Sequence, residues 1–468
     1  MSVTDLSRAL VALLLVAGCT TTVTQVQKAP DGSDPAAEDP GEPAAAGEGG
    51  ATCAKLQIDG FRQAPMGFTL PAARCGNTWN SVAGSGDVRW VTTDLDGDTV
   101  PELVVVSDTC EDAVGTSRWD VYKASATGFA AKPRAFRIPA PRCERSFDAV
   151  ASPATSVRWA TIDLSGDGLV DLVVTSDECD PTVGVTHWDL YEGSADGFAA
   201  APRAYALPAA RCDVPFDSVA GAGRGVTYSL LSLAGGKGVD LVVTSDSCDP
   251  NIGKVRWDVY RAGASGFAKA PSPYGLPTAR CGESFDALAQ YASAKLSWST
   301  LDLSGDGRLD LVVTSDGCDA DVSKKHWDVY RGGEAAFEKA PAPFTLPAAR
   351  CGAAYATTAS TGLGKLSWSL LDLGGGHAPE LLVTSDGCDA DVGKKRWDAY
   401  AWSESGFAAS PRSIAVPAPR CDRPFSEVAG TGPLTYGLFP LTAACVSQLV
   451  VTSDGCDTDV GKKRWDVY

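Results

Sequence analysis

The sequence contains few of the residues, and none of the short motifs, through which most enzymes act. Only three histidines, His187, His326 and His377, occur among 468 residues. A GxSxG elbow, an HExxH motif and a phosphate-binding glycine loop are all missing. The CxxC spacing of zinc sites is missing too. These absences favour a non-catalytic protein over a hydrolase, a metalloprotease or a nucleotide-binding enzyme.

Basic residues are in the minority. The chain has 40 lysines and arginines against 58 acidic residues, which gives a net charge of −18. Such a charge repels nucleic acid phosphates and anionic membrane surfaces, so we expect no nucleic-acid partner. It attracts divalent cations or basic partners, although solubility alone also explains it.

Apolar residues near the N-terminus form a run that is too short to span a bilayer. The run follows Arg8, extends from Ala9 to Ala17 and suits the core of a signal peptide. It leads into a Val-Ala-Gly-Cys sequence ending at Cys19, which resembles a bacterial lipobox. The resemblance implies removal of residues 1–18 and lipidation of Cys19. An ordinary secretory signal with a chance cysteine is the alternative. We expect an exported lipoprotein at a bacterial outer membrane or cell surface, in contact with the membrane through its lipid only.

Residues 19–52 contain mostly Thr, Ala, Pro, Gly, Glu and Asp, with almost no large apolar side chains. A segment of this composition cannot bury enough surface to order itself, so it is interpreted as a disordered tether. The folded part of the chain is therefore expected to occupy residues 53–468.

The folded part is one unit repeated six times. The block RWDVY or a close variant closes each unit, and the intervals between its tryptophans are 69, 69, 70, 70 and 68 residues. A residue present in every copy is interpreted as architecture rather than as a unique active centre. The six tryptophans are Trp119, Trp188, Trp257, Trp327, Trp397 and Trp465.

Each unit contains four segments with β-strand character. In the fourth unit, residues 296–303 alternate in polarity, residues 311–314 are a short apolar run, and residues 326–330 alternate again. A proline-interrupted segment at 337–346 suits an outer edge strand. Four strands per unit, stacked radially, predict an all-β, six-bladed β-propeller of four-stranded blades. An open β-solenoid is the structural alternative.

The two ends of the folded region predict how the ring closes. The chain stops at Tyr468, at the end of a third strand, whereas residues 59–65 match the fourth-strand text at residues 266–271. We therefore expect an N-terminal strand to complete the last blade. In such a ring the loops between second and third strands share a rim with the links between blades. The loops between first and second strands lie on the opposite rim.

The cysteines favour disulfides, because their number without Cys19 is even and the chain carries an export signal. One class ends an ARC or PRC segment, and the other follows Ser-Asp-x. Pairing within a unit spans 35 to 37 residues, whereas pairing with the next unit spans 33 and leaves Cys456 to meet Cys75; both pairings stay open. The remaining two cysteines are expected to form a seventh pair. The fourteen are Cys75, Cys143, Cys212, Cys281, Cys351 and Cys421; Cys110, Cys179, Cys248, Cys318, Cys388 and Cys456; and Cys53 and Cys445.

Acidic residues recur in the loop between the first and second strands. They occupy relative positions 1, 5 and 9 in three units, and position 3 is acidic or Ser. Calcium takes about six to eight oxygen ligands, which carboxylates and carbonyls of a glycine-bearing loop can supply. The alternative is that the acids only cap tight turns. The candidate ligands are Asp94, Asp96, Asp98 and Glu102; Asp163, Ser165, Asp167 and Asp171; and Asp302, Ser304, Asp306 and Asp310.

The DLDGD…PELVVV and DLSGDG…DLVVTSD runs resemble FG-GAP (VCBS-type) repeats, the units of integrin-alpha-like β-propellers. The resemblance covers residues 53–468 and implies calcium in these loops, with about three structural sites. Integrin-type rings usually have seven blades, whereas this sequence supplies six. The other three units depart from the ligand pattern, with Ser232, Gly236 and Asp240 in the third, Asp372, Gly376 and Glu380 in the fifth, and Pro440, Ala444 and Gln448 in the sixth.

The cysteine-bearing rim is the better candidate for recognition. Its later units combine aspartates with Lys324-Lys325, Lys394-Lys395 and Lys462-Lys463, a mixture that suits a protein or polysaccharide partner. Solvated turns are the alternative for this rim, and inter-blade packing is favoured over sugar stacking for the tryptophans. His187 and His326 occupy an arginine position of other units and are expected to form salt bridges.

We therefore expect a monomeric, non-catalytic surface binding or adhesion module that is anchored by lipid and stabilised by calcium and disulfides. A lectin-like carbohydrate binder is one alternative, and it predicts similar pockets repeated between blades. A propeller lyase or hydrolase is another, and it predicts one asymmetric pocket with a polar cluster from a single unit. Fold-level analogy is the only support for choosing among them.

Overall fold

The computed structural model describes residues 59–468 except 155, 224, 234, 236, 237, 292–294, 361–364, 375–377 and 442–445. The signal peptide, Cys19, the tether, Cys53, His377 and Cys445 thus lie outside the described residues. The described part of the chain is built from β-strands and loops. In that part, no helix has the length and apolar character needed to cross a membrane.

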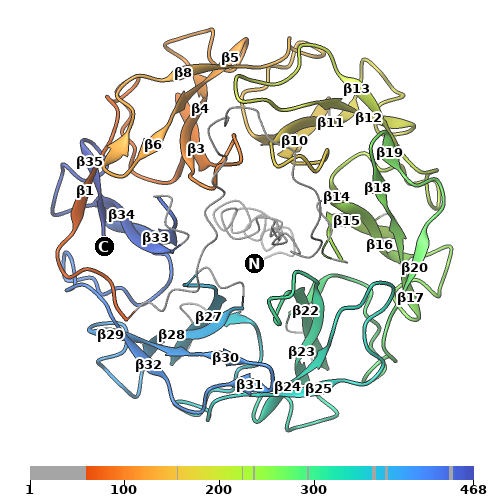
Figure 1. Ribbon diagram of the computed structural model, residues 1–468, viewed down its shortest axis with the longest axis vertical. Coiled ribbons are helices and arrows are strands. Elements are labelled where there is room, and N and C mark those ends of the chain that lie inside the picture. The colour runs from red at the N-terminus through yellow and green to blue at the C-terminus, as the bar shows by residue number, and fades with distance from the viewer. Residues whose placement is uncertain are drawn as a thin grey trace, which may run out of the picture.

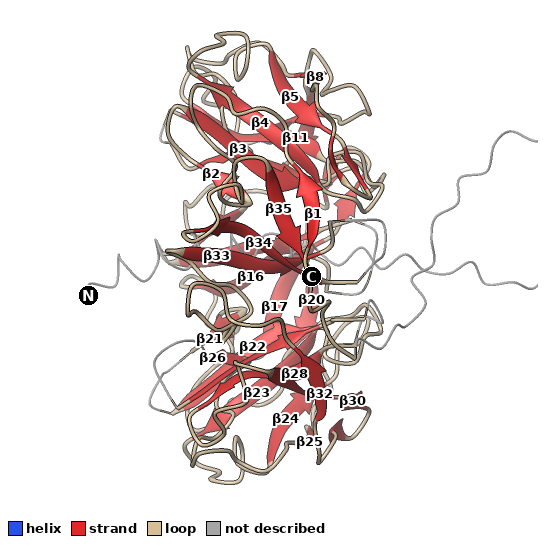
Figure 2. Ribbon diagram, turned by 90° about the vertical axis from the view of Figure 1, so that its left-hand side faces the viewer, coloured by secondary structure: helices blue, strands red, loops and turns tan. Residues whose placement is uncertain are grey.

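The strands form a β-propeller, with sheets arranged around a central axis (Figure 1) and strands running between two rims (Figure 2). Every repeat contributes a first strand near the axis, then a second and a third strand in antiparallel order. The first strands are β3 (Val88–Thr93), β10 (Val157–Ile162), β15 (Val226–Leu231), β22 (Leu296–Leu301), β27 (Leu366–Leu371) and β33 (Leu434–Phe439). The second strands are β4 (Glu102–Asp108), β11 (Asp171–Asp177), β16 (Asp240–Asp246), β23 (Asp310–Asp316), β28 (Glu380–Asp386) and β34 (Gln448–Asp454). The third strands are β5 (Arg118–Tyr122), β12 (His187–Tyr191), β17 (Arg256–Tyr260), β24 (His326–Tyr330), β29 (Arg396–Tyr400) and β35 (Arg464–Val467).

Shorter strands flank these three on both sides. The outer strands, each paired with a third strand, are β8 (Arg134–Arg137), β13 (Arg203–Ala206), β20 (Ser272–Gly275), β25 (Ala342–Thr345), β32 (Arg412–Ala415) and β1 (Met66–Thr69). The innermost strands are β2 (Ala83–Gly84), β9 (Ala151–Ser152), β14 (Ala220–Gly221), β21 (Ala289–Gln290) and β26 (Ala359–Ser360). Small hairpins are formed by β6 (Ala124–Ser125) with β7 (Gly128–Phe129), β18 (Ala262–Gly263) with β19 (Gly266–Phe267), and β30 (Trp402–Ser403) with β31 (Gly406–Phe407).

The prediction of six four-stranded blades is wrong. The propeller has six sheets, but they contain five, six or seven strands. Two kinds of short strand account for the difference. A two-residue strand just before the first strand pairs with it, as β2 pairs with β3. In addition, some hairpins that follow the third strand join the sheet of the preceding repeat, as β7 joins β1. Strands of two residues show no alternation of polarity, so the sequence pattern cannot reveal them.

The outer strands are linked to the following repeat by parallel bridges. Thr69 pairs with Gly128, and Ala206 pairs with Gly266 in the same way. The bridge between Ala415 and Gly60 belongs to the same series and joins the N-terminal segment to the outer strand of the fifth repeat. In addition, β1 pairs antiparallel with β35, so the N-terminal strand completes the last sheet as expected. Figure 1 shows the C-terminus beside β1.

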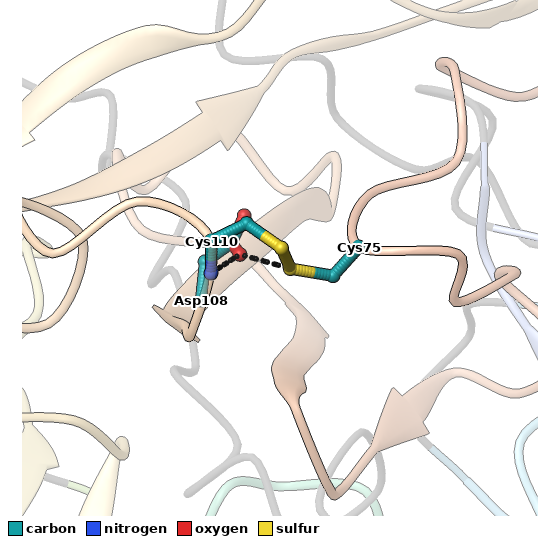
Figure 3. Close-up of side chains that lie close together, drawn as sticks. All are labelled: Cys75, Asp108 and Cys110. Atoms are coloured by element: carbon teal, nitrogen blue, oxygen red, sulfur yellow. Dashed lines mark hydrogen bonds between the residues drawn. A yellow bond between two sulfur atoms is a disulfide. The ribbon is translucent and has the colours of Figure 1, made fainter.

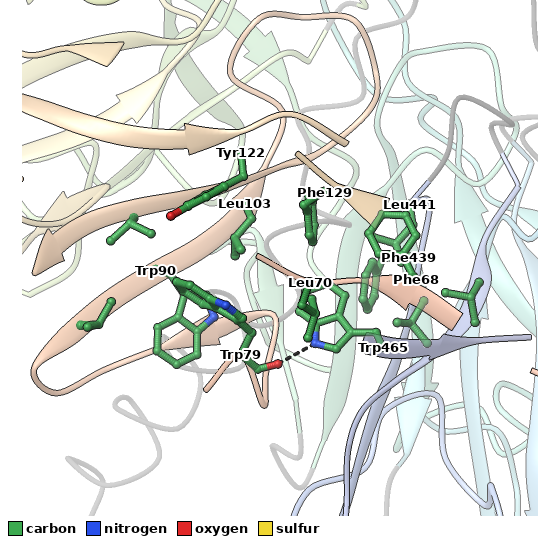
Figure 4. Close-up of a cluster of buried hydrophobic side chains, with 14 of the residues drawn as sticks. Phe68, Leu70, Trp79, Trp90, Leu103, Tyr122, Phe129, Phe439, Leu441 and Trp465 are labelled. Carbon is green, nitrogen blue, oxygen red and sulfur yellow. Dashed lines mark hydrogen bonds between the residues drawn. The ribbon is translucent and has the colours of Figure 1, made fainter. Parts of the chain in front are cut away.

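The hydrophobic core lies between neighbouring sheets. The second strands, rich in Leu and Val, are buried along almost their whole length. The tryptophan of each RWDVY block is fully buried, and Figure 4 shows Trp465 in the cluster shared by the last and first repeats. Its indole N–H donates to the carbonyl of Trp79 at 2.6 Å. A buried tryptophan removes about 150–250 Å² from water, or roughly 4–6 kcal/mol at 25 cal/mol per Å², so these residues are structural.

The strand order separates two rims that carry different chemistry. The disulfide rim consists of the loops between second and third strands and the links that enter the first strands, such as residues 109–117 and 70–82. The acid-loop rim consists of the loops between first and second strands, such as residues 94–101, with the connections that follow the third strands. All cysteines and candidate metal ligands within the described residues lie on the rims expected for them.

Candidate functional site

Six disulfides lie on the disulfide rim, and each joins the two cysteine classes within one repeat. Their Cα atoms are 5.6 to 5.9 Å apart. The prediction of disulfides is confirmed for these twelve cysteines, and the open question of pairing is settled in favour of the within-repeat scheme. The bonds are Cys75–Cys110, Cys143–Cys179, Cys212–Cys248, Cys281–Cys318, Cys351–Cys388 and Cys421–Cys456.

An arginine lies beneath each disulfide and pairs with two buried aspartates. In the third repeat, Arg211 Nε is 2.6 Å from Asp246, and its Nη1 is 2.7 Å from Asp258. The same Nη1 donates to the Tyr260 hydroxyl at 3.1 Å. Burial alone lowers the pKa of Arg211, but its hydrogen bonds to Tyr260 and Asp258 raise the pKa overall. The corresponding arginines are Arg74, Arg142, Arg280, Arg350 and Arg420.

The Arg–Asp–Asp–Tyr network was missed in the sequence, although its signal was present in every repeat. The arginine precedes the first cysteine, one aspartate stands two residues before the second, and the other aspartate and the tyrosine belong to the RWDVY block. Because all charges of the network are paired and mostly buried, loss of one member would destabilise the rim, and the network offers no reactive group.

The disulfides also exclude a metal beneath them. Figure 3 shows Asp108 beside the Cys75–Cys110 disulfide, and its Oδ1 atom is 3.1 Å from Cys75 Sγ. The same oxygen accepts the Cys110 backbone N–H at 2.9 Å. Geometry alone would allow three metal ligands here. Both sulfurs are consumed in the disulfide, however, so no thiolate remains to bind a metal.

The two described histidines lie close to an aspartate, as expected from their position, which is arginine in the other repeats. His187 Nε2 is 3.3 Å from Asp189, and His326 Nε2 is 3.4 Å from Asp328. In the first repeat, Arg118 Nε donates to Asp120 from the equivalent position at 2.8 Å. The histidines therefore replace a structural arginine and do not form a separate polar cluster.

Lysines make the later repeats of the disulfide rim mixed in charge. Lys325, Lys395 and Lys463 each lie within 3.0 Å of the aspartate four residues earlier. These pairs are exposed, and exposed pairs contribute little to stability. The second and third repeats instead expose Val185 and Val255 in the same loop. The rim thus differs around the ring, and these lysine–aspartate pairs lie on the fourth to sixth repeats.

A cavity of about 370 Å³ opens on the disulfide rim between the second and third repeats. Arg158 at the start of β10 and Asp217, which follows Cys212, meet there with Nη1 and Oδ2 2.9 Å apart. The Tyr228 hydroxyl lies 3.5 Å from Asp217 Oδ1. Burial raises the pKa of Tyr228 and the nearby Asp217 carboxylate raises it further, so the hydroxyl stays protonated.

Small side chains form much of the cavity wall. Residues 220–223 read Ala-Gly-Ala-Gly and lie beside Ser152, Thr175 and Ser218, with the buried rings of Trp159 and Tyr228 behind them. Arg89 and Asp148 make a matching 2.9 Å ion pair between the first and second repeats, but neither residue lines this cavity. A partial signal for this ion pair is present in the sequence, because arginine occupies this strand position only in the first two repeats.

The first acid loop has unsatisfied oxygens. Asp94 accepts the backbone N–H groups of Gly97 and Thr99 at 2.8 Å each, which shapes the loop. Asp96 Oδ1 and Glu102 Oε1 are buried and, within the described residues, have no donor except a proton shared between the two carboxyl groups; Glu102 is fully buried. Burial raises the pKa of Glu102, and the neighbouring Asp96 and Asp94 raise it further. Two orphaned carboxylate oxygens side by side suit a bound cation.

The second and fourth acid loops are similar to each other and differ from the first. Asp171 accepts the N–H groups of Leu164, Ser165 and Gly193, and Asp310 has the same three kinds of partner. Burial and repulsion by Asp302 and Asp306 still raise the pKa of Asp310 to about 6. These aspartates therefore cap the loop, as the turn-capping alternative proposed, while their carboxylates remain crowded.

An arginine takes the cation's place in two other loops. Arg261 Nη1 is 2.6 Å from Asp240 in the third repeat, and Arg412 Nη2 is 2.6 Å from Glu380 in the fifth. Gln448 replaces the acid in the sixth repeat. The calcium-ligand pattern is incomplete in these three repeats, and in two of them an arginine neutralises the acid that remains at the end of the loop.

No family model and no curated protein matches this chain, so the FG-GAP-type resemblance rests on the motif alone. A lectin from Agrocybe aegerita, described as recognising non-reducing terminal N-acetylglucosamine, shares 14% identity over 87% of this chain and 90% of its own, with a TM-score of 0.42. An α-L-arabinanase from Penicillium chrysogenum shares 11% identity over 87% of this chain and 98% of its own, with a TM-score of 0.31. The Dos1 propeller shares 8% identity over 78% of this chain and 65% of its own, with a TM-score of 0.21. Likenesses of this size carry no argument about function.

Proposed function

We propose that the protein is a non-catalytic binding module and that the cavity between the second and third repeats binds a neutral saccharide. Within the described residues, the cavity is a single site and not the series of equivalent pockets expected of a lectin, because the equivalent pair Arg89–Asp148 does not line it. The observation that supports this proposal is the composition of the cavity wall, whose polar groups come from two repeats. Arg158, Asp217 and Tyr228 supply donors and acceptors next to aromatic rings. Pockets of about 300–1,000 Å³ with a few convergent polar groups are the usual form of small-molecule sites, and this cavity has about 370 Å³.

The charge of the cavity favours a neutral ligand. Arg158 and Asp217 neutralise each other at 2.9 Å, so an anion or a cation would have to compete with an existing ion pair. A sugar hydroxyl can both donate to the carboxylate and accept from the guanidinium without breaking the pair. Gly221 packs directly against the Tyr228 ring, and the same wall contains the small residues Ala220, Ala222 and Gly223.

A glycan array probed with the intact folded chain tests this proposal, with an array of bacterial and host surface proteins in parallel. We expect signals for neutral glycans, and we expect Asp217→Asn to weaken them by about tenfold or more, as loss of a charge-assisted hydrogen bond does. Asp148→Asn is the matched control, because it alters the equivalent ion pair away from the cavity.

Three outcomes would overturn the saccharide proposal. An equal loss of glycan signal in Asp217→Asn and Asp148→Asn would show that the bound glycan does not depend on the cavity. Silence on the glycan array together with signals for surface proteins would favour the adhesion expected from the family resemblance. Turnover in a substrate screen, with silence on both arrays, would favour a propeller lyase or hydrolase.

We further propose that calcium binds the acid loops and stabilises them. In the first loop the ligands would be Asp94, Asp96, Asp98 and Glu102, and the unpartnered oxygens of Asp96 and Glu102 support the fit. In the second and fourth loops the ligands would be the residues named from the sequence, where crowding of carboxylates is the support. Calcium would neutralise these acids and hold the loops, without chemistry of its own. Equilibrium dialysis against calcium, with no binding at millimolar concentration, would exclude it.

We also propose export and lipid anchoring through Cys19. Six disulfides on one rim are typical of proteins that fold in an oxidising compartment, which agrees with the signal sequence. Cys19→Ser should move the protein from the membrane to the soluble fraction of the cells that express it. Retention of the variant in the membrane fraction would contradict a lipid anchor.

A further inference from the structure

Lys123, which directly follows β5, contacts the acid loop of its own repeat. Its Nζ atom lies 3.0 Å from Asp96 Oδ2 and 2.9 Å from Asp98 Oδ2. A lysine side chain is protonated at neutral pH, so Lys123 brings a full positive charge to these two carboxylates. The lysine therefore occupies the place of a cation among two of the four candidate ligands.

The neutralisation by Lys123 is incomplete. Arg134 Nη2 lies 4.0 Å from Asp96 Oδ2, but within the described residues Asp96 Oδ1 and Glu102 Oε1 have no donor except a proton shared between the two carboxyl groups, although Glu102 is fully buried. The lysine side chain itself is 51% exposed. An ammonium group held at the loop surface can move into solvent, and it leaves the buried oxygens for a smaller cation that fits among them.

The other repeats show that a cation at this place is a variable feature of the ring. In the third repeat Arg261, at the position of Lys123, pairs with Asp240 at 2.6 Å. In the second repeat the position is Glu192, which pairs with Arg203 at 2.6 Å. In the fourth repeat it is Arg331, whose Nη2 donates to the Glu404 carbonyl at 3.2 Å. In the second and fourth repeats the residue at this position thus contacts a group outside the acid loop.

We propose that Lys123 is an internal cation that competes with calcium for the first acid loop. Calcium enters when the Lys123 side chain leaves Asp96 and Asp98, so this loop binds more weakly than its four acidic ligands would otherwise allow. The loop that looks best for calcium in the sequence is thereby made responsive to calcium concentration. This inference rests on the calcium proposal above and concerns only the role of Lys123.

Calorimetric titration of the metal-stripped folded chain with calcium chloride tests the inference. Lys123→Gln removes the charge and keeps a long side chain, and we expect it to tighten binding at one site by about tenfold or more, since each factor of ten requires only about 1.4 kcal/mol. Lys132→Gln is the matched control, because Lys132 is exposed in the same connection. The gain should disappear in the double variant Lys123→Gln, Glu102→Gln, which assigns it to the first loop.

The outcomes separate this inference from the calcium proposal. Calcium binding that is the same in the wild type and in Lys123→Gln would overturn the role of Lys123 and leave calcium binding intact. An equal gain in calcium affinity in Lys132→Gln would show that the effect depends only on the net charge of the protein, and it would also overturn the role of Lys123. Absence of binding in the wild type and in both single variants would overturn the calcium proposal itself. Thermal unfolding of each variant establishes that it is folded.

Discussion

The two rims of the propeller both contain buried acidic side chains but treat them in different ways. On the disulfide rim each buried aspartate pairs with an arginine that also binds a second aspartate and a tyrosine, as Arg211 does with Asp246 and Asp258. On the acid-loop rim, Glu102 is fully buried with one oxygen unpartnered. The first rim is complete by itself, whereas the second requires a proton or a cation to balance its charge. We therefore expect the disulfide rim to contribute most of the stability and the acid-loop rim to make stability depend on bound cations or protons.

The largest effect is expected from breaking a complete network. Arg211→Met should lower the free energy of unfolding by about 3–5 kcal/mol, because it leaves Asp246 and Asp258 buried without their cation. Chemical denaturation with intact disulfides measures it. Arg89→Met is the control, since its ion pair with Asp148 is far more exposed, and it should cost less than about 1 kcal/mol. Similar losses in both variants would contradict the distinction between buried and exposed pairs.

Removal of one disulfide should have the next largest effect. Replacing Cys212 and Cys248 by alanine opens a loop with a sequence separation of 36 residues. Restoring the freedom of this loop in the unfolded chain should lower the free energy of unfolding by roughly 3–4 kcal/mol. Denaturant titration of the double variant provides the test. A loss below about 1 kcal/mol would mean that the Arg211 network alone holds the rim.

The free energy of unfolding of the metal-free protein should depend on pH through the buried carboxyl groups of the acid-loop rim. The folded-state pKa of Asp310 is raised to about 6 from its usual 3.8, and that of Glu102 is also raised. A raised carboxyl pKa stabilises the folded state below the usual value, and this stabilisation is lost as pH rises through the folded-state value. For Asp310 the difference corresponds to about 2–3 kcal/mol.

In the presence of a chelator, the free energy of unfolding should thus increase as pH falls from about 7 to 5, if acids elsewhere contribute little. Denaturant titrations at several pH values measure this slope. Saturating calcium should remove it, because a bound cation replaces the proton. A slope of the opposite sign in the chelator would show that the acid loops are already balanced by contacts within the protein.

The smallest effect is expected on the exposed charges of the disulfide rim. Lys325→Ala removes a pair with Asp321 in which both side chains are at least half exposed. We expect no measurable change in Tm, because solvent screens such pairs. A clear loss of stability in thermal unfolding would show that the mixed-charge loops belong to the structural network and are not free for recognition.

The repeat made the overall architecture predictable. The interval between RWDVY blocks gave the number of units, and the likeness between residues 59–65 and 266–271 located the N-terminal strand. In the structure Gly60 bridges to Ala415 as Gly266 bridges to Ala206, and β1 pairs with β35. The strand count was wrong because two-residue strands depend on how the chain turns, which polarity patterns do not record.

The candidate sites were less predictable because they depend on contacts between distant residues. Both disulfide schemes place cysteines on the same rim, so only distances could choose between them. The cavity depends on Arg158 and Asp217, which belong to different repeats. Lys123 was not expected at the acid loop, because it belongs to a different connection from Asp96 and Asp98.

Thermal unfolding in four conditions tests the division between the rims most directly. The intact chain would be heated with and without a reductant, and with and without a chelator after saturation with calcium. We predict a large fall in Tm with reductant and a smaller one with chelator, since sites with a Kd of about 10⁻⁴ to 10⁻³ M contribute only about 0.6–1.8 kcal/mol each at 2 mM calcium. The two effects should add, because the rims lie at opposite ends of the strands. A fall with chelator as large as the fall with reductant, or no fall with reductant, would contradict this account.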